Sequence, residues 1–173
     1  SLLQTFQIPQ TIDQKNMQTR VLKFSPDSQF IVANGSDVLI YIFNLKTGDL
    51  YGILDGHTDV VSSLLFTSDS QKLISGGFDG KIIVWDIYQK KKLKERDHKS
   101  ESYIQNDHVI NKEEYIVDIV FGFDESFIIV GFMNGKVGIY DANFSQDMST
   151  FLAHQMPLLS VSSSRQSELI CTA

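Results

Sequence analysis

The chain has 173 residues, of which 42% are hydrophobic and 21% are charged, and its formal net charge is −6. This composition is typical of a folded domain and excludes a chain that is disordered along its whole length. The acidic balance argues against a nucleic-acid interface that works through bulk positive charge.

The cysteine content bears on the cellular compartment. The single cysteine, Cys171, excludes an internal disulfide framework and favours an intracellular location, cytoplasmic or nuclear. No apolar run approaches the roughly 20 residues that span a bilayer, so we expect no membrane insertion. The first residue is Ser1, which fits a fragment, a processed chain or an expression product.

An internal repeat organises the sequence. Residues 21–45 align with residues 63–87 without a gap, which places Phe24 on Phe66 and Asp37 on Asp79. The second segment aligns in turn with residues 118–142, 55 positions further on. A partial fourth unit follows, in which His154 aligns with His57.

Each unit reads as short strands separated by turns. In the second unit we expect strands near residues 50–54, 61–66, 72–75 and 81–86. Gly80 lies in a tight turn before the last of these, where a residue without Cβ can adopt a positive φ. That last strand is apolar on both faces, so we expect both faces to be covered. Since no long helical period occurs, the predicted class is all-β.

The second unit also carries a recognisable motif. Gly56-His57 and Trp85-Asp86 are separated by 27 residues, which include Ser75 and the turn residue Asp79. Together with the 42-residue spacing, this pattern resembles the WD-repeat β-propeller family. The resemblance implies about three and a half blades of four-stranded antiparallel sheet, with a ring that this chain leaves incomplete.

The resemblance also predicts how the chain is divided. We expect one WD-repeat propeller segment over 1–173, whose parts are repeat 1 at about 2–45, repeat 2 at about 50–87, repeat 3 at about 88–142 with a loop insertion at 88–114, and a partial repeat 4 at about 148–173. An outer strand is expected near residues 2–6. An open ring exposes strand edges and apolar faces. We therefore hypothesise that the chain is part of a longer propeller, or that another chain completes the ring.

The resemblance implies a hydrogen-bonded chain of four side chains, His57, Ser75, Asp79 and Trp85. In it the indole N–H would donate to the serine hydroxyl, the hydroxyl to the imidazole, and the imidazole to the carboxylate. A serine, a histidine and an aspartate also suggest a hydrolase. We prefer the structural interpretation, because Ser75 lacks a nucleophile-elbow context and the tryptophan engages its oxygen. We expect no catalytic residue and no enzymatic activity.

The other units depart from this motif. The corresponding residues are Lys15, Ala33, Asp37 and Phe43 in the first unit, Lys112, Val130, Asn134 and Tyr140 in the third, and His154 and Thr172 in the fourth. We expect these blades to be held together by apolar packing between sheets.

A candidate partner-binding face follows from the turn residues. In the resembling family these positions lie on the face with the narrower opening, where partners dock. The residues are Ser36, Asp59, Phe78, Met133 and Met156. Large apolar side chains such as Phe78 and Met133 suit interface anchors. The alternative is that both fold inward over the channel.

A basic run occupies residues 90–96, within the inserted segment. It could contact an acidic partner or RNA, although we favour a solvated loop. The nearby Asp97-His98 and Asp107-His108 pairs match no known ligand spacing, so we predict no metal site.

The predicted function is a non-catalytic scaffold that mediates protein–protein interaction within a larger multi-subunit complex. One alternative is a peptide- or substrate-recognition receptor. Another is an RNA-associated assembly factor that uses the basic run. We expect protein partners, no cofactor and no small-molecule substrate.

Overall fold

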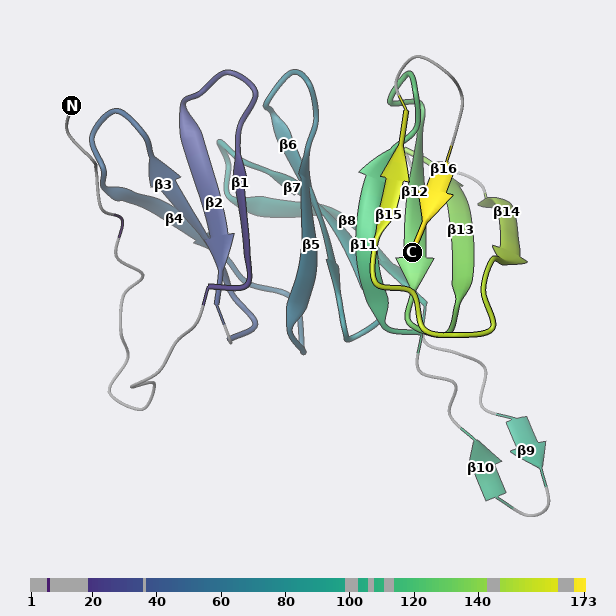
Figure 1. The fold of residues 1–173 in the computed structure, drawn as a ribbon. Coiled ribbons are helices and arrows are strands. Elements are labelled where there is room, and N and C mark those ends of the chain that lie inside the picture. Colours follow the sequence, from purple (N-terminus) through teal and green to yellow (C-terminus); the bar gives the residue numbers. More distant parts are fainter. Residues whose placement is uncertain are drawn as a thin grey trace.

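The computed structural model describes residue 6 and residues 19–35, 37–98, 103–105, 108–110, 114–142, 147–164 and 170–173. The regular elements in these ranges are all strands, which confirms the predicted all-β class (Figure 1). These ranges contain no helix of the length and apolarity that crossing a membrane requires.

Three antiparallel sheets have four strands each, in chain order, and we call them blades 1, 2 and 3. Blade 1 consists of β1 (Val21–Phe24), β2 (Phe30–Asn34), β3 (Ile40–Asn44) and β4 (Leu50–Leu54). Blade 2 consists of β5 (Val61–Phe66), β6 (Lys72–Gly77), β7 (Lys81–Asp86) and β8 (Lys91–Asp97). Blade 3 consists of β11 (Ile116–Phe121), β12 (Phe127–Phe132), β13 (Lys136–Asp141) and β14 (Asp147–Leu152).

Two smaller pairs of strands complete the described structure. Strands β15 (Val161–Ser163) and β16 (Ile170–Thr172) pair as the start of a fourth blade. Strands β9 (Tyr103–Gln105) and β10 (His108–Ile110) form a hairpin between blades 2 and 3, which projects away from the sheets in Figure 1.

The blades are arranged through their first strands. Strand β1 contacts β5, β5 contacts β11, and β11 contacts β15. The described sheets stand side by side and do not close into a ring (Figure 1). The structure therefore shows an open array of blades, as the sequence predicts.

The central strands are buried on both faces. Ile83 and Trp85 of β7 pack toward blade 1, in a cluster that includes Ile42 and Leu54. Ile82 and Val84 of the same strand pack toward blade 3. This confirms the expectation drawn from the uniformly apolar strand, and it explains why a blade depends on its neighbours for burial.

Two glycines allow neighbouring blades to approach closely. A Cβ atom at Gly76 would lie 2.6 Å from Cδ1 of Ile119, and a Cβ atom at Gly131 would lie 2.5 Å from Cγ2 of Val161. The two glycines are 55 positions apart and occupy the same place in blades 2 and 3. A side chain at either glycine would push away the first strand of the following blade.

One sequence prediction needs correction. The segment 88–114 was predicted as a loop, but residues 91–97 form β8, the outer strand of blade 2, and β9 and β10 also lie within the segment. Strand β8 pairs with β7 along its length, for example Ile83 with Glu95. Its lysine-rich composition lacks the alternation that marks a strand, because its side chains face solvent and its backbone bonds come from β7.

The strand expected near residues 2–6 falls outside the described residues except for Phe6, which is not part of a strand. The ring of Phe6 lies 5.7 Å from that of Phe43. It joins a cluster with Ile31 and Tyr41, on the face of blade 1 that does not contact blade 2. Phe6 therefore covers part of that face.

Candidate functional site

Four polar side chains of blade 2 form a continuous hydrogen-bonded chain. The indole N–H of Trp85 donates to Ser75 Oγ at 2.8 Å. His57 Nε2 lies 2.8 Å from the same oxygen. On its other side, His57 Nδ1 lies 3.0 Å from Asp79 Oδ2 and 3.1 Å from Oδ1. The structure thus brings all four sequence-predicted residues of this network together.

Different parts of the blade supply these side chains. Ser75 lies in β6 and Trp85 in β7, while His57 belongs to the connection from β4 to β5 and Asp79 to the turn from β6 to β7. Ser75, His57 and Trp85 are buried. Buried polar groups are costly when they lack partners, so the network attaches the connection and the turn firmly to the sheet.

The same geometry is unsuited to nucleophilic catalysis. Ser75 Oγ accepts a hydrogen bond from Trp85 and is completely buried, so no substrate carbonyl could approach it. A triad needs an exposed nucleophile next to donors for an oxyanion. The residues fit a structural role.

Asp79 is the most heavily bonded member of the network. Its carboxylate also accepts the backbone N–H of Thr58 at 2.8 Å and that of Lys81 at 3.0 Å. Burial by itself raises the pKa of Asp79, but the hydrogen bond and charge interaction with His57, together with these N–H groups, hold that pKa below its ordinary value. Gly80 completes the turn with a φ of 74°.

The candidate partner-binding face lies at the end of the blades where these turns occur. Phe78 and Met133 occupy equivalent turns. The Phe78 N–H donates to the carbonyl of Val60, just before β5, and the Met133 N–H donates to that of Tyr115, just before β11, each at 2.9 Å. Both side chains are half-buried. These backbone hydrogen bonds hold each turn next to the start of the first strand of its blade.

The remaining predicted residues of this face are more exposed or not described. Asp59 is exposed, and Met156 is 73% exposed on the connection from β14 to β15. On the same connection Leu159 is 79% exposed. Ser36 lies outside the described residues. The face therefore combines exposed apolar side chains with half-buried ones.

Phe78 points partly inward. Its ring packs edge-on against Tyr115, with 5.7 Å between centroids. It also lines a cavity of about 330 Å³, together with Arg20, Val60 and Val117 from the residues around the first strands of three blades. The Phe78 ring thus packs partly against Tyr115 and partly lines this cavity.

Sequence reasoning missed two residues of this face, Arg20 and Tyr115. Arg20 immediately precedes β1, and Tyr115 immediately precedes β11. Neither belongs to a motif, and Tyr115 is 37 positions from Phe78. Their position just before a first strand is the signal that could have identified them, because these positions all meet at one end of the blades.

The basic run lies partly against aromatic and acidic side chains of the chain itself. Lys90 Nζ lies 4.0 Å from the centre of the Tyr51 ring, and the Arg96 guanidinium lies 4.8 Å from that of Tyr140. Lys92 forms an ion pair with Glu95. Strand β8 is therefore not a simple row of solvated charges.

Among the described residues, no three His, Cys, Asp or Glu side chains are placed to hold a metal ion. His98 rests against the rings of Phe132 and Tyr140. Asp107 lies outside the described residues.

Comparison with known proteins finds a matching sequence family for part of the chain. The sequence model described as "WD domain, G-beta repeat" matches residues 48–86, which contain the whole hydrogen-bonded network. Residues 48–86 therefore carry a WD repeat. The match covers the outer strand of blade 1 and the first three strands of blade 2, so the sequence repeat straddles two blades.

Relatives and solved structures extend this similarity. The chain is 25% identical over 173 residues to a WD repeat-containing protein 91 homolog from Dictyostelium discoideum, covering 98% of the chain and 22% of that protein. It is 34% identical over 62 residues to a THO complex subunit 6 homolog from Danio rerio, covering 36% of the chain and 19% of that protein. The chain thus spans about a fifth of the length of these relatives.

The structure of U3-55K has a similar fold. It matches with a TM-score of 0.72 at 16% sequence identity, over 87% of this chain and 44% of that one. This likeness supports the WD-repeat fold.

The WD-repeat network is retained unevenly in the other blades. In the partial fourth blade, His154 Nε2 lies 2.7 Å from Thr172 Oγ1, which reproduces the histidine–hydroxyl contact.

In blade 1, the Tyr41 hydroxyl donates a hydrogen bond to Asp37 at 2.6 Å. Burial raises the pKa of Tyr41, and this hydrogen bond and the charge of the carboxylate raise it further. Blade 3 carries Asn134, whose side chain accepts the Lys136 N–H. Lys15 and Lys112 lie outside the described residues.

Proposed function

We propose that the chain is a non-catalytic WD-repeat scaffold, which mediates protein–protein interaction within a larger multi-subunit complex. The observation that carries this proposal is the apolar surface at one end of the blades. Met156 is strongly exposed there, and its backbone carbonyl lies beside Gly135 in the turn that carries half-buried Met133. Phe78 occupies the equivalent turn of blade 2 and is also half-buried. Clustered exposed apolar side chains are typical of interaction sites.

The family comparison supports this interpretation. One relative is named as a subunit of the THO complex, and U3 small nucleolar RNA-associated protein 18 homolog from Homo sapiens is 33% identical over 79 residues. We infer that this chain likewise binds other proteins in an assembly, in the cytoplasm or nucleus. We expect neither cofactor nor small-molecule substrate, since Ser75, His57 and Asp79 are saturated by internal bonds.

A recognition receptor is a second candidate. The cavity beside Phe78 is lined by apolar side chains and by Arg20, which is exposed. An apolar cavity with one cationic group suits a peptide that carries an apolar residue beside an acidic one. This candidate uses the same face and predicts the same surface residues.

An RNA-associated assembly factor receives less support. Lys92 is paired with Glu95, and Lys90 and Arg96 lie over aromatic rings, so these three cations are less available to phosphates. A mobility-shift assay of the full chain with RNA, repeated across salt concentrations, tests this alternative. Binding that weakens steeply with salt and is lost in Lys91→Ala/Lys94→Ala would support it.

The experiment for the scaffold proposal compares captured partners quantitatively. Tagged full-length protein is purified from its source cell as wild type, Phe78→Ala, Met156→Asp and the control Phe24→Ala. Phe24 is exposed on β1, away from this face. We expect Phe78→Ala and Met156→Asp to lose the same partners by about tenfold or more, the scale of an interface anchor. An unchanged set of partners in both variants would contradict the proposal.

A further inference from the structure

A second hollow lies between blades 2 and 3, at the opposite end from the candidate partner-binding face. It is a cavity of about 320 Å³ near the ends of β5, β7 and β13. Its apolar lining includes Ile74, Val84 and Phe121, which are buried, and Leu93 on β8, which is 40% exposed. The volume is at the lower end of ligand pockets and suits one large apolar side chain.

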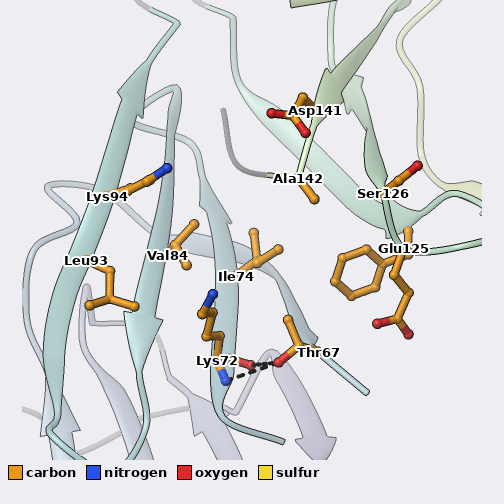
Figure 2. Close-up of a pocket in the computed structure, with 11 residues that line it drawn as sticks. Thr67, Lys72, Ile74, Val84, Leu93, Lys94, Glu125, Ser126, Asp141 and Ala142 are labelled. Atoms are coloured by element: carbon orange, nitrogen blue, oxygen red, sulfur yellow. Dashed lines mark hydrogen bonds between the residues drawn. The ribbon is translucent and has the colours of Figure 1, made fainter. Parts of the chain in front are cut away.

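The charges around this cavity are divided by blade. Blade 2 contributes Lys72 and Lys94, and blade 3 contributes Glu125 and Asp141. In Figure 2 Lys94 and Lys72 lie on the blade 2 side, above and below Val84, and Asp141 and Glu125 lie on the blade 3 side. The rim therefore presents a positive wall facing a negative wall across an apolar floor.

The mouth of the cavity is held by contacts between the two blades. Glu125 Oε2 accepts the backbone N–H of Ser68 at 3.1 Å, which ties the β11–β12 turn to the β5–β6 turn. Thr67 Oγ1 accepts the N–H of Lys72 at 3.1 Å and donates to its carbonyl, which closes the β5–β6 turn (Figure 2). Such walls need little rearrangement to bind a ligand, which lowers the entropic cost of binding.

The opposite charges of the two blades around the cavity indicate which kind of ligand it can bind. A nucleic acid or another polyanion would meet repulsion from the carboxylate wall, and a purely apolar molecule would leave both charged walls unused. An extended peptide can place an apolar side chain between charges of opposite sign, since neighbouring side chains lie only a few ångströms apart along it.

We propose that this cavity docks an extended segment of a partner protein. One apolar side chain of the segment enters between Val84 and Phe121, an acidic residue lies toward Lys72 and Lys94, and a basic residue lies toward Glu125 and Asp141. The inference rests on the proposed scaffold function only in that the ligand is a protein. It concerns a different surface from that of Phe78 and Met156.

Designed peptides test the pattern directly. Four probes labelled with a fluorophore of zero net charge share one frame: Glu-Gly-Phe-Gly-Lys, Glu-Gly-Phe-Gly-Glu, Lys-Gly-Phe-Gly-Lys and Glu-Gly-Gly-Gly-Lys, each with neutral capped ends. Binding to the full chain is measured by fluorescence anisotropy. We expect the mixed-charge phenylalanine probe to bind most tightly. Each like-charged probe should bind about fivefold more weakly, since one exposed pair is lost and one repulsion is gained. The probe without phenylalanine should lose on the order of tenfold or more.

Variants locate the binding to the cavity. Leu93→Ser should weaken the mixed-charge probe about tenfold, and Leu93→Met should retain binding, because it keeps an apolar wall of similar volume. The matched control is Leu22→Ser, since Leu22 is 47% exposed on β1 and lies outside the cavity. Lys94→Glu should shift the preference toward the Lys-Gly-Phe-Gly-Lys probe.

The outcomes separate this inference from the proposed function. Equal binding of the three phenylalanine probes, no binding of the mixed-charge probe at millimolar concentration, or an unchanged affinity in Leu93→Ser would overturn it. A preference for the probe without phenylalanine would indicate simple charge pairing and would also overturn it. Met156→Asp tests the other face, and we expect it to leave peptide affinity unchanged while it removes captured partners.

Discussion

The hydroxyl of Ser63 and the carboxylate of Asp118 join the first strands of blades 2 and 3, with 3.0 Å between Ser63 Oγ and Asp118 Oδ1. The other carboxylate oxygen accepts the Ser160 hydroxyl and the Val161 N–H, each at 3.1 Å. One side chain of β11 thus connects three successive blades. A polar contact of this kind sets the spacing of the blades where apolar packing alone would allow sliding.

This relationship should appear as thermodynamic coupling. We expect Ser63→Ala and Asp118→Ala each to lower the free energy of unfolding by about 1–3 kcal/mol, because hydrogen bonds to charged groups are lost. The double variant should lose less than the sum, with a coupling of at least about 0.5 kcal/mol. Urea unfolding measures all three values. Asp49→Ala, at an exposed turn, is the control and should change stability by less than about 0.5 kcal/mol. Strict additivity would contradict the contact.

The network around Ser75 predicts an effect of similar size at a single position. Ser75→Ala removes the acceptor of the Trp85 N–H and the partner of His57 Nε2, both of which are buried, so we expect a loss of about 1–3 kcal/mol. Trp85 is the single tryptophan, so its fluorescence reports the unfolding of blade 2 directly. Ser68→Ala is the matched control, since that side chain is exposed. A Ser75→Ala variant as stable as wild type would show that the network is not needed.

The pKa of Asp79 predicts how stability changes in acid. Because the folded pKa lies below the ordinary value of 3.8, Asp79 stabilises the fold fully above that value and loses its contribution as the pH falls through the lower folded pKa. Asp79→Asn should therefore be less stable than wild type at neutral pH, and the difference should shrink below about pH 4. Urea unfolding at a series of pH values measures this difference. A difference that stays constant, or that grows in acid, would contradict the assignment.

The close approach at Gly76 predicts steric destabilisation. Gly76→Ala places a Cβ atom 2.6 Å from Cδ1 of Ile119, within the packed interface of blades 2 and 3, and we expect a loss of about 1–3 kcal/mol. Gly52→Ala is the informative comparison, because its Cβ would meet the Lys90 side chain at the same 2.6 Å, and a flexible surface side chain can move. Thermal melts of the two variants should differ clearly. Equal melting temperatures would indicate that the blades separate easily.

The period of the sequence was sufficient to predict contacts within a blade. Ser75 pairs with Ile83 across β6 and β7, and this register brings Trp85 and Asp79 to the positions that the motif requires. Side chains alternate between the two faces of a strand, which is consistent with the contacts that the resemblance to WD repeats implied. The outer strand β8 was not predicted, because its lysine-rich sequence lacks the alternation of apolar and polar residues that indicates a strand. Its backbone hydrogen bonds come from the neighbouring strand β7.

Contacts between blades were decided by the tertiary structure. The packing of Phe78 on Tyr115, the bond from Ser63 to Asp118, and the charged cavity between Lys94 and Glu125 all depend on the rotation and spacing of one sheet relative to the next. No sequence interval encodes these quantities, because they result from how whole apolar faces interdigitate. The strands follow from local sequence patterns and the hydrogen-bonded network within blade 2 from the resemblance to WD repeats, whereas the surfaces available to a partner arise only when the blades pack together.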